Sequence, residues 1–131
     1  MGGLMSIRTL LIMLLLHFFA DFTLQVPCGL ANLKQKRWWA QQVNDLEKSI
    51  YRNDWKMGLF CHSLWWSILI CLPYFLSDNE WVLLAVIALN THIHAIIDDL
   101  KCNKFKINLN QDQALHLVQI LVTWALLGLI P

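Results

Sequence analysis

Charged residues are scarce in this sequence of 131 residues: only 15% are Asp, Glu, Lys or Arg, whereas 57% are hydrophobic. Soluble globular proteins carry roughly a quarter charged residues, and a small domain has a large surface to cover with polar groups. The shortage therefore excludes a cytosolic monomer. The net charge of +1 excludes a generally basic nucleic-acid binder and a generally acidic disordered chain. We therefore expect no nucleic-acid partner.

Several familiar motifs are also absent from the sequence. It has no His-Glu-x-x-His pattern, no Gly-rich phosphate loop and no Gly-x-Ser-x-Gly elbow. It has no Cys-x-x-Cys either, so its four cysteines are interpreted as thiols that fill apolar space rather than as metal ligands. Without an internal repeat or a Gly/Ser linker, residues 1–131 are expected to form a single domain.

Long apolar stretches are what the sequence does contain. Four of them approach the ~20 residues that a helix needs to cross a bilayer, where backbone groups must be paired within the segment. They cover about 4–26, 57–76, 81–100 and 107–131. This predicts an all-α fold, an integral membrane four-helix bundle. A signal peptide is the alternative for the first stretch, because Arg8 precedes an apolar run, but no small-residue cleavage site follows.

Basic residues are distributed unevenly between the segments that connect these stretches. Nine of the ten lie in residues 27–56 and 101–106, and only Arg8 lies on the other side. Cytoplasmic loops of membrane proteins carry an excess of Lys and Arg. We therefore expect both segments in the cytoplasm and both chain termini outside it, in a multi-pass protein whose surroundings are membrane lipids.

The segment between the first two stretches has a helical pattern of its own. Trp39, Val43, Leu46 and Ile50 follow one another at spacings of four, three and four residues. Such spacing is typical of an amphipathic helix, and tryptophans beside Lys and Arg suit the headgroup layer of a membrane. We predict an interfacial helix within residues 28–55 that anchors the neighbouring spans, with a lid over the substrate as the alternative.

Histidines and aspartates lie inside the apolar stretches, where a carboxylate costs ~2.5–3.5 kcal/mol even on a lenient scale. Six of them form pairs four residues apart, which places both members on one helix face. The pairs are His17 with Asp21, His94 with Asp98, and Asp112 with His116, and the second stretch adds His62. At a rise of ~1.5 Å per residue, all seven lie in the cytoplasmic half, roughly 5–15 Å from its boundary.

The rest of the polar pattern limits the kind of site. The outer half has few polar groups, whereas a permeation path needs them along its whole length, so a closed site reached from the cytoplasm is favoured over a channel. His92 and Asp99 lie off the shared face and are weaker candidates. Asp99 is expected to pair with a nearby lysine such as Lys101.

Imidazole and carboxylate groups are ligands for zinc, manganese and iron. We predict a divalent metal site, with zinc first and manganese or iron as alternatives, and metal ligands from His17, Asp21, His62, His94 and His116. Asp98 and Asp112 are assigned as catalytic base or further ligands. Seven candidates exceed the needs of one tetrahedral ion, so either two ions bind or some residues orient others. Alternatively, the pairs are metal-free hydrogen-bonded clamps between helices.

Four blocks of sequence carry these residues: His17-Phe-Phe-Ala-Asp21, Leu59-Phe-Cys-His62, His94-Ala-Ile-Ile-Asp98 and Asp112-Gln-Ala-Leu-His116. With these blocks the chain resembles a small membrane family known as domain of unknown function 3307. The resemblance covers nearly the whole chain. It implies a four-span protein in the inner (cytoplasmic) membrane of bacteria, or encoded by their phages, and it brings no established reaction. Many members have a second histidine one turn after His62, where this chain has Trp66.

The functional hypothesis is a cytoplasm-facing metal site that hydrolyses or transfers a group on an amphiphilic substrate, such as a phospholipid or an isoprenoid phosphate. Sparse His and Asp on helices are loosely similar to membrane-bound metal-dependent hydrolases, which is an analogy. Lys34, Lys36 and Arg37 either attract an anionic headgroup or only mark the cytoplasmic side. Two alternatives stay open: a metal- or proton-coupled transporter that forms homo-oligomers, and a non-enzymatic accessory protein.

Overall fold

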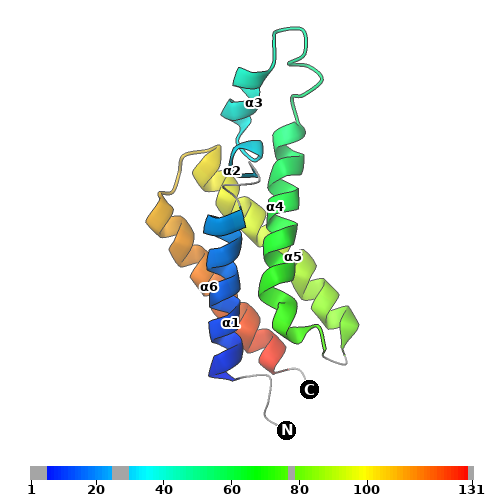
Figure 1. Ribbon diagram of the computed structural model, residues 1–131, viewed down its shortest axis with the longest axis vertical. Coiled ribbons are helices and arrows are strands. Elements are labelled where there is room, and N and C mark those ends of the chain that lie inside the picture. The colour runs from blue at the N-terminus through cyan, green and yellow to red at the C-terminus, as the bar shows by residue number, and fades with distance from the viewer. Residues whose placement is uncertain (1–5, 25–29, 77–78, 130–131) are drawn as a thin grey trace.

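The structure is a computed structural model, and it describes residues 6–24, 30–76 and 79–129. These ranges contain helices and turns and no strand. Four long helices form a bundle (Figure 1): α1 (Ile7–Phe18), α4 (Asp54–Cys71), α5 (Glu80–Cys102) and α6 (Leu109–Gly128). Two short helices, α2 (Leu30–Leu33) and α3 (Lys36–Gln42), lie at one end of it. The predicted all-α bundle is confirmed.

Three helical segments are long and apolar enough to cross a membrane: Ile7–Leu24, Asp54–Tyr74 and Glu80–Cys102. They correspond to the first three predicted spans. Helix α6 packs in the same bundle but is not among the three, because its first turns carry polar side chains from Asn110 to Gln113. The helices therefore support a membrane protein, while a fourth crossing and the orientation of the chain stay predictions.

The surface of the bundle is apolar to an extent that fits lipid rather than water. Large hydrophobic side chains such as Leu15, Met57 and Trp81 expose more than 60% of their area. Contiguous apolar surface of this kind marks contact with a membrane or a partner. The interior of the bundle contains packed apolar side chains, including Met13 and Ile120, which are fully buried.

Helix α1 changes its winding just before the predicted boundary of the first span. Its N-cap is Ser6, whose hydroxyl accepts a hydrogen bond from the backbone of Thr9 at 3.2 Å, and the chain continues after Phe18 as a π-helix, η1, over Phe19–Leu24. π-Helical turns are rare and frequently lie at functional sites. Asp21, one of the predicted ligands, lies in this turn.

The helix predicted within residues 28–55 forms only in part, as α3, and the predicted stripe from Trp39 to Ile50 is not one continuous helix. Helix α3 ends at Gln42, Val43 is extended (φ −117°, ψ 144°), and residues 43–53 form turns. Asn44 and Glu47 cap each other there, since the backbone amide of Glu47 donates to Asn44 Oδ1 at 3.0 Å and that of Asn44 to Glu47 Oε2 at 3.3 Å. Such side-chain bonds compete with helical ones. The first residues of the segment, including Cys28, lie outside the described residues.

The α2 segment is held tightly against the bundle. A Cβ atom on Gly58 of α4 would lie 2.5 Å from the carbonyl oxygen of Leu33, so only glycine allows this approach. On the other side, Asn103 at the end of α5 accepts from the backbone amide of Lys36 at 2.8 Å and donates to the carbonyl of Lys34 at 3.2 Å. These contacts fix the backbone from which the Lys34 side chain enters the bundle.

Candidate metal centre

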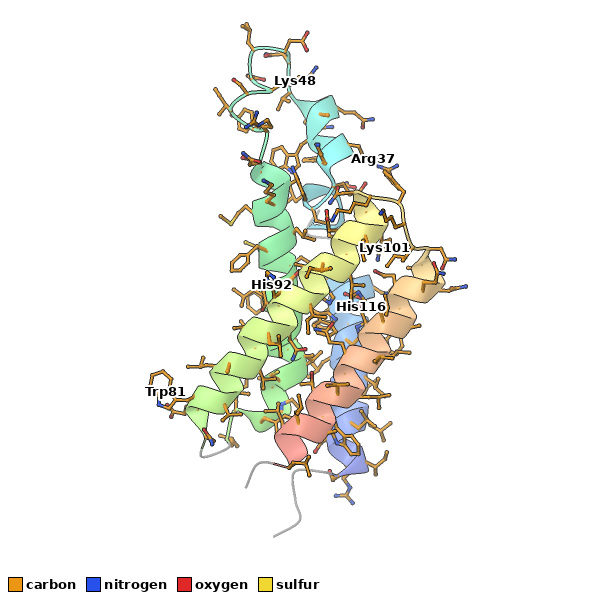
Figure 2. All side chains as sticks on the ribbon, turned by 180° about the vertical axis from the view of Figure 1, so that it is seen from behind. Arg37, Lys48, Trp81, His92, Lys101 and His116 are labelled. Carbon is orange, nitrogen blue, oxygen red and sulfur yellow. The ribbon has the colours of Figure 1, made fainter. Side chains whose placement is uncertain are left out.

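The seven predicted site residues come from all four long helices and meet inside the bundle. Four of them, His17, His94, Asp112 and His116, expose 0% of their area, and Asp98 exposes 1%. His62 and the Asp21 side chain expose 3% and 5%. Figure 2 shows His116 in the middle of the bundle, with Lys101 nearer the α2 end. Seven ionisable groups are thus concentrated in one buried cluster.

Asp98 is the hub of this cluster. Its Oδ2 atom lies 3.3 Å from His62 Nε2 and 3.7 Å from His94 Nε2, and its Oδ1 atom lies 3.4 Å from His116 Nε2. The two Nε2 atoms of His62 and His94 are 3.1 Å apart. Two imidazole nitrogens this close repel each other unless a proton or a cation lies between them, because each carries a lone pair.

The spacing of these donor atoms fits a tetrahedral ion. With zinc–nitrogen and zinc–oxygen bonds of about 2.0–2.1 Å, ligand atoms at the corners of a tetrahedron are about 3.3 Å apart. The three separations within His62, His94 and Asp98 are 3.1, 3.3 and 3.7 Å. Asp21 Oδ1, 3.6 Å from His62 Nε2, lies at a similar separation from this set. The centre needs little rearrangement to bind an ion.

Two groups of residues have ligand atoms that all lie within 4.8 Å of one another: Asp21 with His62 and His94, and His94 with Asp98 and His116. His94 belongs to both groups. Two buried atoms of the cluster, His116 Nε2 and Asp112 Oδ1, have no hydrogen bond within the described part of the chain, although they lie 3.5 Å apart and His116 Nε2 also lies 3.4 Å from Asp98 Oδ1. Buried polar atoms of this kind need an explanation, and a bound ion is one of the usual ones.

Lys34 is a member of the cluster that sequence analysis missed. The sequence predicts that it either attracts an anionic headgroup or marks the cytoplasmic side, yet it is 3% exposed, and its Nζ atom donates to Asp98 Oδ2 at 2.5 Å. A lysine is almost never this buried unless it is paired. No signal in the local sequence distinguishes it from its neighbours, since its place depends on how α2 docks on α4 and α5.

A second lysine, Lys101, also differs from its predicted role. Asp99 was expected to pair with a nearby lysine such as Lys101, and a nearby lysine does pair with it, but Lys101 itself donates a hydrogen bond to Asp112 and lies 3.8 Å from Asp98 Oδ1. Asp99 pairs instead with Lys104, at 2.7 Å. The end of α5 unwinds after Cys102, which lets Lys104 turn back to Asp99 while Lys101 faces α6.

His17 lies outside both ligand groups and is oriented by Trp66. The indole Nε1 of Trp66 donates to His17 Nδ1 at 2.9 Å. Since that nitrogen accepts the indole hydrogen bond, the neutral ring carries its own proton on Nε2. His17 in this tautomer has no free lone pair for an ion, and its Nδ1 atom lies 3.6 Å from Asp21 Oδ2, where both atoms are acceptors. Trp66 also stacks on His94, with ring centroids 4.2 Å apart.

Replacing Trp66 with phenylalanine should therefore destabilise the bundle through His17. The phenyl ring keeps an aromatic contact with His94 but leaves the buried Nδ1 acceptor unpaired, which typically costs about 1–3 kcal/mol. Denaturant unfolding in detergent micelles measures this loss. Trp65→Phe is the matched control, because Trp65 is the next residue and is 57% exposed. Equal losses for the two variants would refute the role given to the indole.

Polar groups continue along α5 and α6 beyond the cluster, but they bond mainly to one another. Gln119 Nε2 donates to Asn90 Oδ1 at 2.8 Å, and Asn90 Nδ2 donates to Thr123 Oγ1 at 2.9 Å. Such bonds between α5 and α6 hold membrane helices together. His92 is exposed on α5, and Cys61, Cys71 and Cys102 are free thiols.

Comparisons with known proteins found no matching family model, no matching curated protein and no matching solved structure. The resemblance to the family known as domain of unknown function 3307 therefore stays a prediction. The chemistry of the cluster is the remaining guide to function.

Proposed function

We propose that this chain is a membrane protein that binds one divalent metal ion in the His/Asp cluster and uses it for hydrolysis or group transfer on an amphiphilic substrate. The observation that carries the proposal is the set of donor atoms around Asp98, whose separations of 3.1–3.7 Å match the edges of a tetrahedron. Mixed imidazole and carboxylate donors favour zinc, with manganese or iron as alternatives.

The balance of charge favours one ion over two. Three carboxylates (Asp21, Asp98 and Asp112) and two ammonium groups (Lys34 and Lys101) leave a net charge of −1 when the imidazoles are neutral. One divalent ion changes this to +1, whereas two ions change it to +3. Uncompensated charge is costly in a low-dielectric interior. A single ion also agrees with His94 belonging to both ligand groups.

The residues around the ion divide into ligands and groups that act on protons. His62, His94, His116 and Asp98 would supply ligands, and Asp21 lies at ligand distance from His62. Asp112 suits a base, because Lys101 binds its Oδ2 atom and leaves Oδ1 without a hydrogen bond among the described residues. When bound, a divalent ion supplies Lewis-acid chemistry and an activated water. An amphiphilic substrate fits a cluster buried among helices that are apolar enough for a bilayer.

Metal content of the purified protein tests the binding step. Protein extracted in mild detergent without chelators should carry about one zinc ion per chain, and His94→Ala should lose it, because structural ligands are needed together. The control is His92→Ala, which removes an exposed histidine two residues away on the same helix. A metal content below about one-tenth of an ion per chain, or equal loss in both variants, would refute the metal centre.

The catalytic step needs a separate test. Zinc-loaded protein in nanodiscs should hydrolyse a phospholipid or an isoprenoid phosphate from a screened panel. Asp112→Asn should keep the ion and lose about 10²–10⁴-fold in rate, the usual contribution of general acid–base catalysis. Asp99→Asn serves as the control, since Asp99 pairs with Lys104 outside the cluster. If a metal-loaded protein turns over none of these lipids, the ion is bound for another purpose.

A structural clamp is the second candidate, and one observation favours it. Lys34 bonds to Asp98, and Lys101 bonds to Asp112, so two of the three carboxylates already have a cation. Buried polar pairs of this kind hold helices together in membranes. The clamp hypothesis predicts a metal-free protein whose stability does not change when zinc is added. The metal-centre hypothesis predicts that zinc raises the unfolding temperature.

A further inference from the structure

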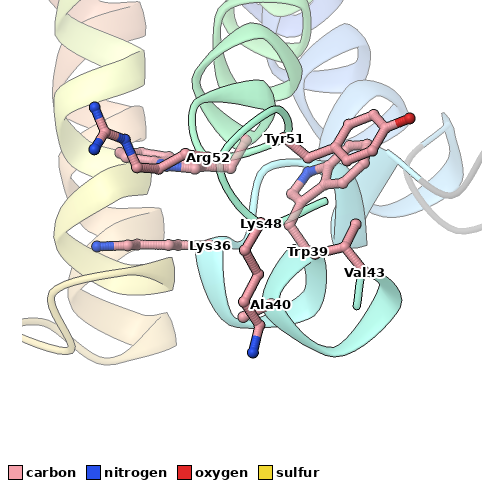
Figure 3. Close-up of a pocket in the computed structure, with 8 residues that line it drawn as sticks. Lys36, Trp39, Ala40, Val43, Lys48, Tyr51 and Arg52 are labelled. Carbon is pink, nitrogen blue, oxygen red and sulfur yellow. The ribbon is translucent and has the colours of Figure 1, made fainter. Parts of the chain in front are cut away.

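A cavity of about 220 Å³ lies in the part of the chain that replaces the predicted interfacial helix. It is enclosed by α3, the turns of residues 43–53 and the beginning of α4 (Figure 3). Three aromatic and three basic side chains line it: Trp39, Tyr51, Trp55, Lys36, Lys48 and Arg52. None of these residues belongs to the His/Asp cluster. The cavity is smaller than the ~300–1,000 Å³ of drug-sized sites, so it suits a compact group, and its lining surface is mainly apolar.

The aromatic wall of this cavity is fixed in place. The Trp39 indole donates to the carbonyl of Leu33 at 2.7 Å, and its ring stacks on Tyr51 with centroids 6.3 Å apart and planes within 11°. Trp55 lies at the start of α4 with the Lys56 ammonium 5.8 Å from its ring centroid. A rigid wall loses little entropy when a ligand binds.

Two of the three cations at the cavity have no acidic partner. The Lys48 ammonium is 2.5 Å from Asp45 Oδ1, and this hydrogen bond lowers the pKa of the Asp45 carboxyl. Lys36 and Arg52, in contrast, form no ion pair with any acidic residue that the structure describes. Figure 3 shows their side chains extending to the same side of the cavity. Both of these positive charges are therefore uncompensated by a carboxylate of the described residues.

Two other basic residues nearby make contacts outside the cavity. Lys34, which sequence analysis grouped with Lys36 and Arg37 as a site for anionic headgroups, is buried on Asp98. The Arg37 guanidinium lies 5.4 Å from the centre of the Phe105 ring. Arg37 and Lys56 keep their positive charges in such ring contacts, so Lys36 and Arg52 are not the sole cations at this end; they are the two that line the cavity without an acidic partner among the described residues.

We propose that this cavity binds the phosphate group of an anionic membrane lipid through Lys36 and Arg52. A guanidinium and an ammonium are the side chains that proteins use for phosphate, and tryptophan and tyrosine are typical of the headgroup layer. The cavity borders Asp54–Tyr74, one of the three segments that are apolar enough to cross a membrane. A phosphate at this level belongs to a lipid. This lipid site depends on α4 crossing a membrane. It does not depend on metal binding in the His/Asp cluster.

The test compares two double variants that change the charge of the same end equally. Lys36→Gln/Arg52→Gln removes the two cations of the cavity, and Lys104→Gln/Lys106→Gln removes two other cations from the loop after α5. Each protein is taken from nanodiscs of phosphatidylcholine with a minor fraction of phosphatidylglycerol, and retained lipid is counted by native mass spectrometry. A parallel titration adds inorganic phosphate to the protein in a zwitterionic detergent.

The cavity variant should retain phosphatidylglycerol at least about tenfold less than the unmodified protein, which is the effect of losing one hydrogen bond to a charged group. The control variant should retain it nearly unchanged. If both variants lose the same amount of phosphatidylglycerol, the effect comes from the net charge of that end of the molecule, and the proposed site is refuted. Inorganic phosphate that binds as tightly as the lipid would overturn the assignment to a lipid.

Discussion

Replacing Asp98 with asparagine is expected to cost the metal-free protein about 3–5 kcal/mol of stability, the usual effect of removing one partner of a buried ion pair. The substitution keeps the size of the side chain but leaves the Lys34 ammonium, which is 3% exposed, without its carboxylate. It also removes the group that three histidines approach within 3.3–3.7 Å. Unfolding is measured in micelles after treatment with a chelator, so that loss of an ion does not contribute.

A double-mutant cycle shows whether this cost comes from Lys34. Adding Lys34→Met to Asp98→Asn removes the stranded ammonium and should restore a large part of the lost stability, because the coupling between two buried partners is far from additive. The matched control is Asp99→Asn at the next position, whose pair with the exposed Lys104 should contribute less than about 1 kcal/mol. If the double variant is no more stable than Asp98→Asn alone, Lys34 and Asp98 are not coupled in the folded protein.

Spacing of four residues correctly predicted which His and Asp side chains lie close together in the structure. His94 with Asp98 and Asp112 with His116 lie 3.7 and 3.5 Å apart, because both members of each pair share one face of a regular helix. Counting residues from the predicted cytoplasmic boundary also placed His62 and His94 at similar depths, and their Nε2 atoms are 3.1 Å apart. Periodicity and helix rise are local properties, so one sequence was enough to predict which side chains would meet.

Two features of the cluster depend on more than local periodicity. Lys34 reaches Asp98, 64 residues away in sequence, only because α2 folds back against Gly58. Trp66 looked like a departure from the resembled family, yet it fixes His17 by a hydrogen bond. Both roles are set by tertiary packing, and an apolar or basic residue type alone does not predict them.

Helix α3 ends at Gln42, although the apolar spacing predicts a helix that continues to Ile50. The cause is local. Leu46 and Ile50, which completed the predicted stripe, are 88% and 72% exposed. The apolar period predicts a helix only when no side chain competes for backbone amides, and Asn44 competes at the point where α3 would have to continue. The cavity lined by Trp39, Tyr51 and Trp55 exists because the chain turns here instead of continuing as a helix.

Replacing Lys34 with methionine is expected to tighten zinc binding about ten- to hundredfold, if the cluster is a metal centre. The ammonium lies 2.5 Å from Asp98 Oδ2, one of the proposed ligand atoms, so an incoming ion must displace it. Two unit charges 4 Å apart repel by about 4 kcal/mol at an effective dielectric constant of 20, and the loss of packing around α2 offsets a part of this. Competition with a chromophoric chelator measures the affinity.

Two further variants separate this competition from a change in net charge. Lys34→Arg keeps the charge and should give no gain, whereas Lys104→Met removes a charge from an ion pair outside the cluster and should change the affinity less than about twofold, since exposed charges are screened. A weaker affinity in Lys34→Met would mean that the lysine holds Asp98 in position for the ion. The direction of the change therefore decides whether Lys34 competes with the metal or supports its ligand.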